Sequence, residues 1–370
     1  MRFKVPFVIC LALALAFLSY PTVKVRAKEA PACSAASAIL YHPATGSVLY
    51  EKDADMRRPI ASTTKIVTAL TVLQNAGDLD RPVRIPGSAC GIEGSSLYLT
   101  DGETLTVREL LYGLLLASAN DAAAALAVTT SGSIESFADR MNETARELGL
   151  ANSSFKNPHG LDDPDHYSTA RDLVLFTAAA LENETFREIV GTKRFSIPSA
   201  DGGRRYLLNH NKLLTFLPDC VGIKTGFTKK SGRCLVGAAE RDGELLISVT
   251  LNDPNDWNDH VALLEYGFAS LKKTTLLSAG ELVFDLPVVN GNARSVRVTN
   301  REKIALSLPS GASEPRKEIR LPRFLPAPIA KGQIVGYVLY ELNGRTVGES
   351  PLVAEDAVAE IKYKKGLFHR

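Results

Sequence analysis

Residues 59–73 read Pro-Ile-Ala-Ser-Thr-Thr-Lys-Ile-Val-Thr-Ala-Leu-Thr-Val-Leu. The apolar residues after Lys65 recur at helical spacing, and Gly77 follows as a C-terminal cap, so the stretch predicts a helix. Ser62 and Lys65 then lie three positions apart on one face, where their side chains meet. A serine hydroxyl becomes a nucleophile when a base removes its proton, and a buried lysine beside a second cation can be that base.

A second motif, Ser118-Ala119-Asn120, lies between two strongly apolar segments that are expected to be helices. The first of these begins with a capping box formed by Thr106 and Glu109. In a rigid connection of this kind Ser118 can relay a proton, and Asn120 offers a donor and an acceptor to a substrate amide.

A third motif, Lys224-Thr225-Gly226, lies within residues 220–228, which read as a strand followed by a polar turn and a second strand. Lys224 and Thr225 can hold a carboxylate through charge-assisted hydrogen bonds. Gly226 removes a side chain where a substrate backbone could lie along the strand. Lys224 is also the second cation that would lower the proton affinity of Lys65.

Each motif is weak in isolation, because Ser62, Ser118 and Asn120 could be ordinary helix caps and Lys224 an ordinary solvated lysine. Ser-x-x-Lys also begins at Ser153 and at Ser270. Only Ser62 precedes both the Ser-x-Asn and the Lys-Thr-Gly motif. Three motifs in this order are typical of β-lactamases and penicillin-binding proteins.

From about residue 34 to residue 355 the chain resembles the serine-type D-alanyl-D-alanine carboxypeptidases, which are low-molecular-mass penicillin-binding proteins. The resemblance includes residues 94–98, 157–162 and 166–172, and Tyr337 with residues 351–353 near the C-terminus. Two positions depart from the family pattern. Ala119 stands where Gly or Asp is frequent, and Phe227 follows the glycine where relatives often have His.

The resemblance implies a mechanism in which Ser62 attacks the bond between the two D-alanines of a peptidoglycan stem pentapeptide and forms an acyl-enzyme. Water then hydrolyses this ester, whereas a β-lactam leaves a slowly hydrolysed acyl group. No metal and no cofactor are implied. The implied roles are nucleophile for Ser62, proton acceptor for Lys65, proton relay for Ser118, peptide binding for Asn120, carboxylate binding for Lys224 and Thr225, close substrate approach at Gly226, and an oxyanion hole from the backbone N–H groups of Ser62 and Phe227.

The expected fold class is α+β. The family fold is an antiparallel five-stranded sheet sandwiched by helices, and the chain's own pattern agrees, because residues 37–51 read as a hairpin, residues 106–182 as helices and residues 193–251 as strands. Short strand-like runs after residue 283 predict a small C-terminal β-sandwich. The expected divisions are a signal peptide at 1–27, the penicillin-binding domain at 34–276, a β domain at 277–358 and a basic tail at 359–370.

The first 27 residues resemble a secretory signal, with Arg2 and Lys4 before an apolar run and Val25-Arg26-Ala27 as a cleavage site. We therefore expect export to the outer face of the cytoplasmic membrane or to the cell wall. Removing the signal takes four of the 43 basic and none of the 41 acidic residues, and the resulting slightly acidic chain argues against nucleic acid as a partner. The short basic tail predicts at most a loose association with membrane or wall.

Cys33, Cys90, Cys220 and Cys234 remain after the signal, and we expect free, mostly buried thiols. No cysteine and histidine grouping has metal-ligand spacing. Three histidines are interpreted as structural, and one of them, His210, is a candidate to border the cleft. These residues are His159, His166 and His210.

Three alternatives keep the same nucleophile. A β-lactamase would need a base for fast deacylation, but the Glu-x-x-Leu-Asn pattern is missing between residues 118 and 224, where Arg205 precedes Leu208-Asn209. A non-catalytic penicilloyl receptor would keep the fold without activity. A D,D-endopeptidase would cut crosslinked stem peptides instead of terminal ones.

Overall fold

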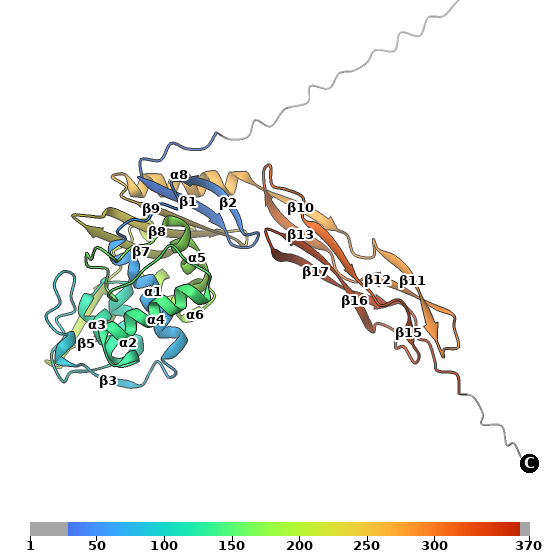
Figure 1. Cartoon of the computed structure of the whole chain (residues 1–370), viewed down its shortest axis with the longest axis horizontal. Helices are drawn as coiled ribbons and strands as arrows, with labels where there is room; N and C mark the ends of the chain where they lie inside the picture. The colour runs from blue at the N-terminus through green and yellow to red at the C-terminus, as the bar shows by residue number, and fades with distance from the viewer. Residues whose placement is uncertain (1–28, 363–370) are drawn as a thin grey trace, which may run out of the picture.

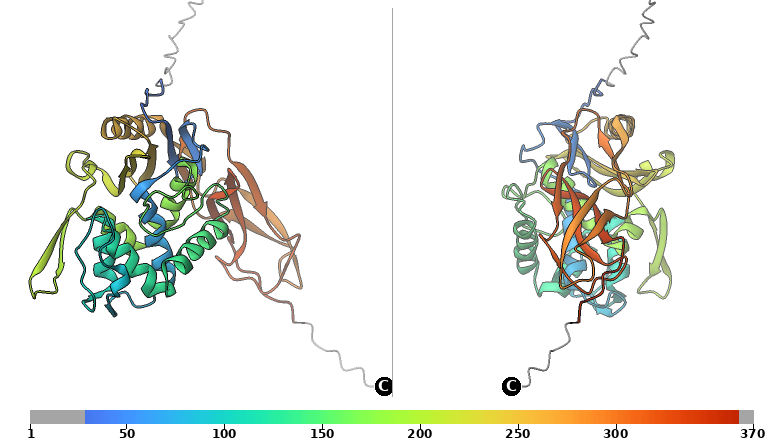
Figure 2. Two further views of the ribbon diagram at one scale, coloured as in Figure 1. Left: turned by 60° about the vertical axis from the view of Figure 1, so that its left-hand side comes forward. Right: turned by 90° about the vertical axis from the view of Figure 1, so that its right-hand side faces the viewer.

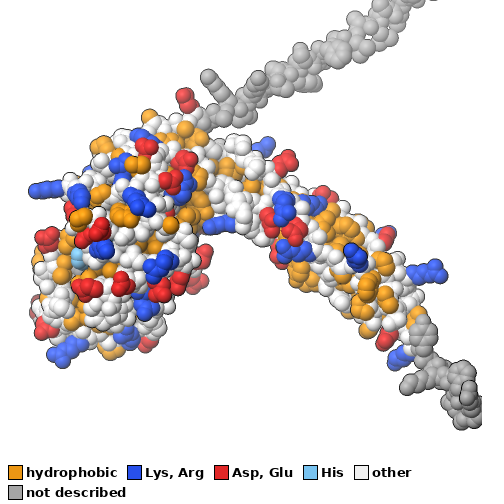
Figure 3. All heavy atoms as spheres, in the orientation of Figure 1, with side chains coloured by type: hydrophobic (Ala, Val, Ile, Leu, Met, Phe, Trp, Pro, Cys, Tyr) orange, Lys and Arg blue, Asp and Glu red, His pale blue; other side chains and the backbone are white. Residues whose placement is uncertain are grey.

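The structure is a computed structural model that describes residues 29–362 (Figure 1). The predicted signal peptide and most of the basic tail lie outside the described residues. A rounded N-terminal part of helices around a sheet is followed by an elongated β part that extends away from it (Figures 2 and 3). Within residues 29–362, no helix has both the length and the apolar character that a membrane crossing requires.

The N-terminal part is built on a five-stranded antiparallel sheet with the order β2-β1-β9-β8-β7. β1 pairs with β2 on one side and, on the other, with β9, which follows some two hundred residues later in the chain. Its strands are β1 (Ser37–His42), β2 (Ser47–Lys52), β7 (Cys220–Thr228), β8 (Gly232–Arg241) and β9 (Glu244–Leu251).

Alternating side chains of this sheet enter two hydrophobic cores on its opposite faces. Ile39 and Ile247 belong to the large core shared with most of the helices, whereas Leu40 and Leu246 pack with α8 (Asp256–Ser270) on the other face. The remaining helices are α1 (Thr64–Asn75), α2 (Val107–Leu115), α3 (Asn120–Ser131), α4 (Ile134–Glu147), α5 (Ala170–Leu181), α6 (Glu184–Gly191) and the short α7 (Leu213–Phe216). The predicted helix-covered sheet is confirmed.

Local signals explain where several helices begin and end. The side chain of Thr106 accepts the N–H of Glu109 and the Glu109 carboxylate accepts the N–H of Thr106, which completes the predicted capping box of α2. Gly77, directly after the cap of α1, has a φ of 62° that glycine adopts without strain. Two 3₁₀ turns and two short antiparallel strand pairs complete this part, namely η1 (Ala61–Thr63), η2 (Gly87–Ala89), β3 (Pro82–Arg84) with β4 (Thr104–Thr106), and β5 (Arg194–Pro198) with β6 (Arg204–Leu208).

The C-terminal part contains two sheets, one of order β10-β13 and one of order β14-β16-β17-β12-β11-β15. The predicted C-terminal strands are present, and the structure adds β10 and β15, which the sequence pattern did not reveal. Because β10 pairs with β13, we propose that the domain boundary lies at the start of β10, slightly before residue 277. The strands are β10 (Leu271–Leu277), β11 (Val283–Val289), β12 (Ser295–Asn300), β13 (Ile304–Pro309), β14 (Arg316–Arg320), β15 (Leu325–Pro326), β16 (Ile334–Leu342) and β17 (Arg345–Ala354).

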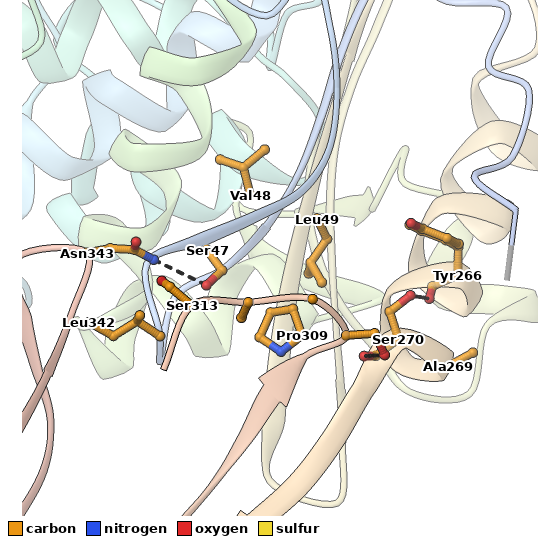
Figure 4. A pocket seen from close by; sticks show the side chains of 13 residues that line it. Ser47, Val48, Leu49, Tyr266, Ala269, Ser270, Pro309, Ser313, Leu342 and Asn343 are labelled. Atoms are coloured by element: carbon orange, nitrogen blue, oxygen red, sulfur yellow. Dashed lines mark hydrogen bonds between the residues drawn. The ribbon is translucent and has the colours of Figure 1, made fainter. Parts of the chain in front are cut away.

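The turn between β16 and β17 contacts the turn between β1 and β2. Asn343 Nδ2 donates to Thr45 O at 3.1 Å and to Ser47 Oγ at 3.3 Å, and Arg345 Nη1 donates to Pro43 O at 3.4 Å. Beside this contact lies a hollow of about 530 Å³, which Figure 4 shows with Asn343 and Ser47 on its wall. These bonds hold the β part against an end of the sheet.

The cysteines of the described residues are free thiols; Cys33 and Cys234 are buried, and Cys90 and Cys220 are half-buried. On neighbouring strands, Cys234 faces Gly226 and Cys220 faces Ala239, so the two cysteines of the β7–β8 hairpin point to different partners.

Candidate active site

Ser62 and Lys65 meet where the η1 turn continues into α1. Lys65 is completely buried, and its Nζ lies 2.8 Å from Ser62 Oγ. Its other two contacts are with Asn120 Oδ1 at 2.7 Å and with the backbone oxygen of His159 at 2.8 Å. The amine is thus surrounded by three oxygen atoms that come from three separate segments of the chain.

The surroundings of Lys65 strongly favour its neutral form. Its pKa lies well below the ordinary value, first because burial removes the ammonium from water and second because Lys224 is a nearby positive charge. Asp121 opposes these effects but does not outweigh them. A neutral amine is the protonation state that can accept a proton from a serine hydroxyl.

The connection between α2 and α3 places Ser118 and Asn120. Ser118 has a left-handed backbone with φ at 58° and is buried, yet it borders the pocket described below. Asn120 begins α3, and its Nδ2 donates to Glu93 O at 2.5 Å while its N–H donates to Ser95 O at 2.7 Å. The side-chain amide is therefore fixed, with its oxygen directed at Lys65.

The strand β7 lies at the edge of the sheet and carries the third motif. Lys224 is buried, its Nζ donates to Thr225 O at 2.9 Å, and burial lowers its pKa to about 7. Gly226 passes close to the nucleophile turn, because a Cβ there would lie 3.1 Å from the N atom of Ser62. Phe227, which follows, leaves 65% of its surface exposed.

These elements surround a cavity of about 570 Å³. Five of the predicted site residues line it, namely Ser62, Ser118, Thr225, Gly226 and Phe227. Three others, Lys65, Asn120 and Lys224, are buried behind this lining. The remaining lining residues are Ser95, His210, Lys212, Arg233, Cys234, Asp256 and Trp257.

The structure adds groups that the motifs did not reveal. The backbone oxygen of His159 binds Lys65, and no side-chain pattern signals a carbonyl in that role. One pocket wall is formed by Arg233, whose Nη2 lies 2.6 Å from Asp256 Oδ1 and whose guanidinium lies 5.7 Å from the centre of the Trp257 ring. The available sequence signal for this wall is Trp257, the single tryptophan of the chain, which lies in the first turn of α8.

The three histidines that the sequence singles out lie around the site. Burial, followed by the charge of Lys65, lowers the pKa of His159 to about 3, and burial lowers that of His166 to about 4. His166 Nε2 lies 2.8 Å from Thr64 Oγ1, in the same turn as the nucleophile. His210 lines the cavity, and burial lowers its pKa as well.

The sequence matches the family described as D-alanyl-D-alanine carboxypeptidase over residues 24–255, and the penicillin-binding protein 5 C-terminal domain over residues 271–360. It is 34% identical to D-alanyl-D-alanine carboxypeptidase DacF of Bacillus subtilis, over 87% of this chain and 85% of that protein. It is 31% identical to the DacC carboxypeptidase of Escherichia coli, over 94% of this chain and 90% of that protein.

Solved structures agree with these sequence matches. Penicillin-binding protein 5 from Haemophilus influenzae superposes with a TM-score of 0.66 at 30% identity, covering 89% of this chain and 99% of that chain. The Streptomyces K15 DD-transpeptidase superposes with a TM-score of 0.62 at 36% identity, covering 65% of this chain and 99% of that chain. The chain therefore belongs to the D-alanyl-D-alanine carboxypeptidase family of serine peptidases, extended by a C-terminal domain of the penicillin-binding protein 5 type.

Proposed function

We propose that the protein removes the terminal D-alanine from peptidoglycan stem pentapeptides through an acyl-enzyme on Ser62, and that β-lactams acylate the same residue. Membership of the family supports the reaction. The contacts of Lys65 support the assignment of the nucleophile and its base, and they are the observation that carries the proposal.

The orientation of the Lys65 amine follows from how many protons it can donate. A neutral amine has two N–H groups and one lone pair, whereas the nitrogen of Lys65 has three oxygen neighbours. Asn120 Oδ1 and the His159 carbonyl can only accept, so they take the two N–H groups. The lone pair is left facing Ser62, the only neighbour of the three with a proton to give. The site therefore holds the base in the orientation that the attack requires.

Lys224 is suited to bind the terminal carboxylate of the stem peptide. Its pKa of about 7 reflects burial, with no charge-pair partner within residues 29–362, and a bound carboxylate would restore the charged form. Thr225, on the pocket wall, adds a hydroxyl to the same group. We assign Asn120 to the peptide, because its side-chain amide donates to Glu93 O and its backbone N–H donates to Ser95 O, which holds the residue in place.

We assign the oxyanion hole to the backbone N–H groups of Ser62 and Phe227. Gly226 supports this assignment, because its missing side chain leaves the space beside the Ser62 N–H open. Removing one such donor typically slows acyl transfer by about 10²–10³-fold.

We assign to Ser118 the transfer of a proton to the departing D-alanine. Among the described residues, none of the three hydrogen bonds of Lys65 goes to Ser118. We infer that the relay from Lys65 forms in the tetrahedral intermediate, when Ser62 Oγ is bonded to the substrate carbon. The proton then reaches the amine nitrogen as the C–N bond breaks and the Ser62 ester forms.

We further propose that the chain is exported and acts on the outer side of the cytoplasmic membrane, in loose association with membrane or wall. The signal-like residues 1–27 and the basic C-terminal tail support this proposal. Cell fractionation after verified signal cleavage tests it. Recovery in membranes that resists high salt contradicts the loose association.

The first experiment measures D-alanine release from an acylated L-Lys-D-Ala-D-Ala peptide. Ser62→Ala should abolish release and labelling by a fluorescent penicillin. Ser270→Ala is the matched control, since Ser270 also begins a Ser-x-x-Lys sequence but bonds Tyr266 O at the end of α8, and it should keep both activities.

The same assay separates the alternatives. Release from a crosslinked dimer but not from the monomer would favour the endopeptidase. Labelling without release from any stem peptide would favour the receptor, and rapid turnover of penicillin would favour the β-lactamase.

A further inference from the structure

A cluster of three potential metal ligands lies where the start of the described chain meets α8. Cys33, Asp253 and Asp259 each direct one ligand atom into a common space, and these atoms all lie within 4.8 Å of one another. All three residues are buried, and Asp253 is completely inaccessible. Asp253 lies between β9 and α8, and Asp259 lies in the first turn of α8.

Neighbouring hydrogen bonds fix the two carboxylates in place. Ser34 Oγ lies 2.8 Å from both Asp253 Oδ1 and Asp259 Oδ2, so the two carboxylates share its single hydroxyl proton, and the Ser34 N–H donates to Asp259 Oδ2 at 2.6 Å. The N–H of Asn255 donates to Asp253 Oδ1 at 3.0 Å. Such outer partners are what orient metal-binding carboxylates.

One carboxylate oxygen of this cluster has no hydrogen-bond partner among the described residues. Among the described residues, Asp253 Oδ2 is a buried side-chain oxygen without a hydrogen bond, whereas its other oxygen has two. A buried carboxylate oxygen left without a donor is costly. A cation between the three side chains would satisfy it.

We propose that Cys33, Asp253 and Asp259 bind a divalent cation of the zinc type. One sulfur and two carboxylate oxygens, completed by a water molecule, give the four ligands that Zn²⁺ prefers, and a thiolate selects against Mg²⁺ and Ca²⁺. Two carboxylates and a thiolate carry three negative charges, of which a divalent cation would offset two in this buried place.

The groups around the cluster bear on how the cation would compete with protons. Burial, and then the charges of Asp259 and Asp253, raises the pKa of the Cys33 thiol to about 11, so the cation must displace its proton. Burial also raises the pKa of Asp253. For Asp259, hydrogen bonds from Ser34 first, and then from Cys33 and Asp253, together outweigh burial and lower the pKa. From β2, Tyr50 faces the same groups, and Lys52 Nζ donates to Cys33 O at 2.9 Å.

The site would connect the start of the described chain to a wall of the catalytic pocket. Asp253 and Asp259 bracket Asp256 and Trp257, which line that pocket. The N–H of Asp253 also donates to Arg233 O, the residue that pairs with Asp256. A bound cation would therefore stiffen this wall from behind, at a site separate from Ser62.

The test uses purified protein, freed of metal by a chelator, and titrates it with Co²⁺. We expect one Co²⁺ per chain, a thiolate-to-cobalt charge-transfer band that Zn²⁺ abolishes, and a higher melting temperature with Zn²⁺. Cys33→Ala should lose the band, and Asp253→Asn should weaken binding at least about tenfold. Cys90→Ala is the matched control, because Cys90 is another free thiol outside the cluster, and it should behave as the parent protein.

Absence of the band in the parent protein, or a band that survives Cys33→Ala, overturns the proposal. Absence of binding together with a melting temperature that Asp253→Asn raises would indicate that the two carboxylates share a proton instead. Cys33→Ala leaves both carboxylates in place, so we expect the metal-free variant to be as stable as the parent protein. Loss of the charge-transfer band in this variant then reports the loss of a metal ligand. The activity of Ser62 is not part of any readout.

Discussion

Replacing Gly160 with alanine should displace the nucleophile turn without touching any motif residue. Gly160 has a φ of +85°, and a Cβ added there would fall far inside the 3.0 Å that real Cβ atoms keep from the carbonyl oxygen of Ala61. The same Cβ would lie 2.8 Å from Thr64 Oγ1. The Ala61 carbonyl shares one peptide unit with the Ser62 N–H, so a shift of the first moves the second.

The size of the effect follows from this geometry. Two effects reduce the stability of Gly160→Ala. A left-handed backbone costs a residue with a Cβ about 1–2 kcal/mol, and the new Cβ clashes with the Ala61 carbonyl. Relieving that contact requires a displacement of about 1 Å, and a shift of this size in a catalytic group costs about a hundredfold in rate. Loss of one oxyanion donor predicts a similar drop of about 10²–10³-fold.

Gly149→Ala separates the cost of the left-handed backbone from the effect of the clash. Gly149 also has a left-handed backbone, with a φ of +72°, but nothing lies within 4 Å of the place that its Cβ would take. We expect both variants to lose stability in thermal unfolding. Only Gly160→Ala should slow acylation by a fluorescent penicillin and D-alanine release. Equal acylation rates in the two folded variants would refute the coupling between Gly160 and Ser62.

Three further predictions concern charge, acid stability and the domain contact. Because burial lowers the pKa of Lys224 to about 7, kcat/KM for a carboxylate-terminated peptide should fall about tenfold per pH unit above that value, and Lys224→Arg should flatten this decline in a pH profile. His260 is buried between Ser248 and Thr250 with its pKa lowered to about 3 by burial, so the unfolded chain takes up its proton first. The free energy of unfolding should therefore fall by up to about 1.4 kcal/mol per pH unit as the pH drops from 6.5 towards 3, and urea unfolding of His260→Gln should lack this part of the slope. Asn343→Ala removes two hydrogen bonds between the domains, so proteolytic cleavage near Leu271 should become faster while D-alanine release stays unchanged. A lower rate of release would show instead that the β domain shapes the site.

The sequence predicts the helices correctly where apolar residues recur at helical spacing or where a capping motif marks the first turn. The apolar spacing after Lys65 and the capping box at Thr106 specify local structure through backbone hydrogen bonds, and these elements appear where predicted. The strand β10 escaped prediction because Leu271–Leu277 carries lysines and threonines, and its pairing with β13 is a long-range contact that no local pattern encodes.

In the site, a sequence motif can indicate side chains but not the backbone groups that contact them. Ser62, Lys65 and Lys224 are recognisable because their chemistry resides in side chains at fixed spacings. The third partner of Lys65 is the carbonyl of His159, which any residue could supply. The sequence likewise did not reveal the contact between Lys65 and Asn120, and the relay through Ser118 stays a proposal.

The left-handed residues around the pocket have a consequence for engineering. Ala61, Ser118 and Ile223 have φ values of 46°, 58° and 98°, and each directly precedes, or is itself, a residue of the three motifs. Conformations of this kind cost about 1–3 kcal/mol each and persist only where the surroundings enforce them. Glycine would relax the backbone at Ala61 and Ser118 but would loosen side chains that the reaction needs. At Ile223 it would also leave a cavity in the hydrophobic core, where this side chain is completely buried. Selection for heat resistance should therefore enrich substitutions elsewhere in the protein and leave these three unchanged.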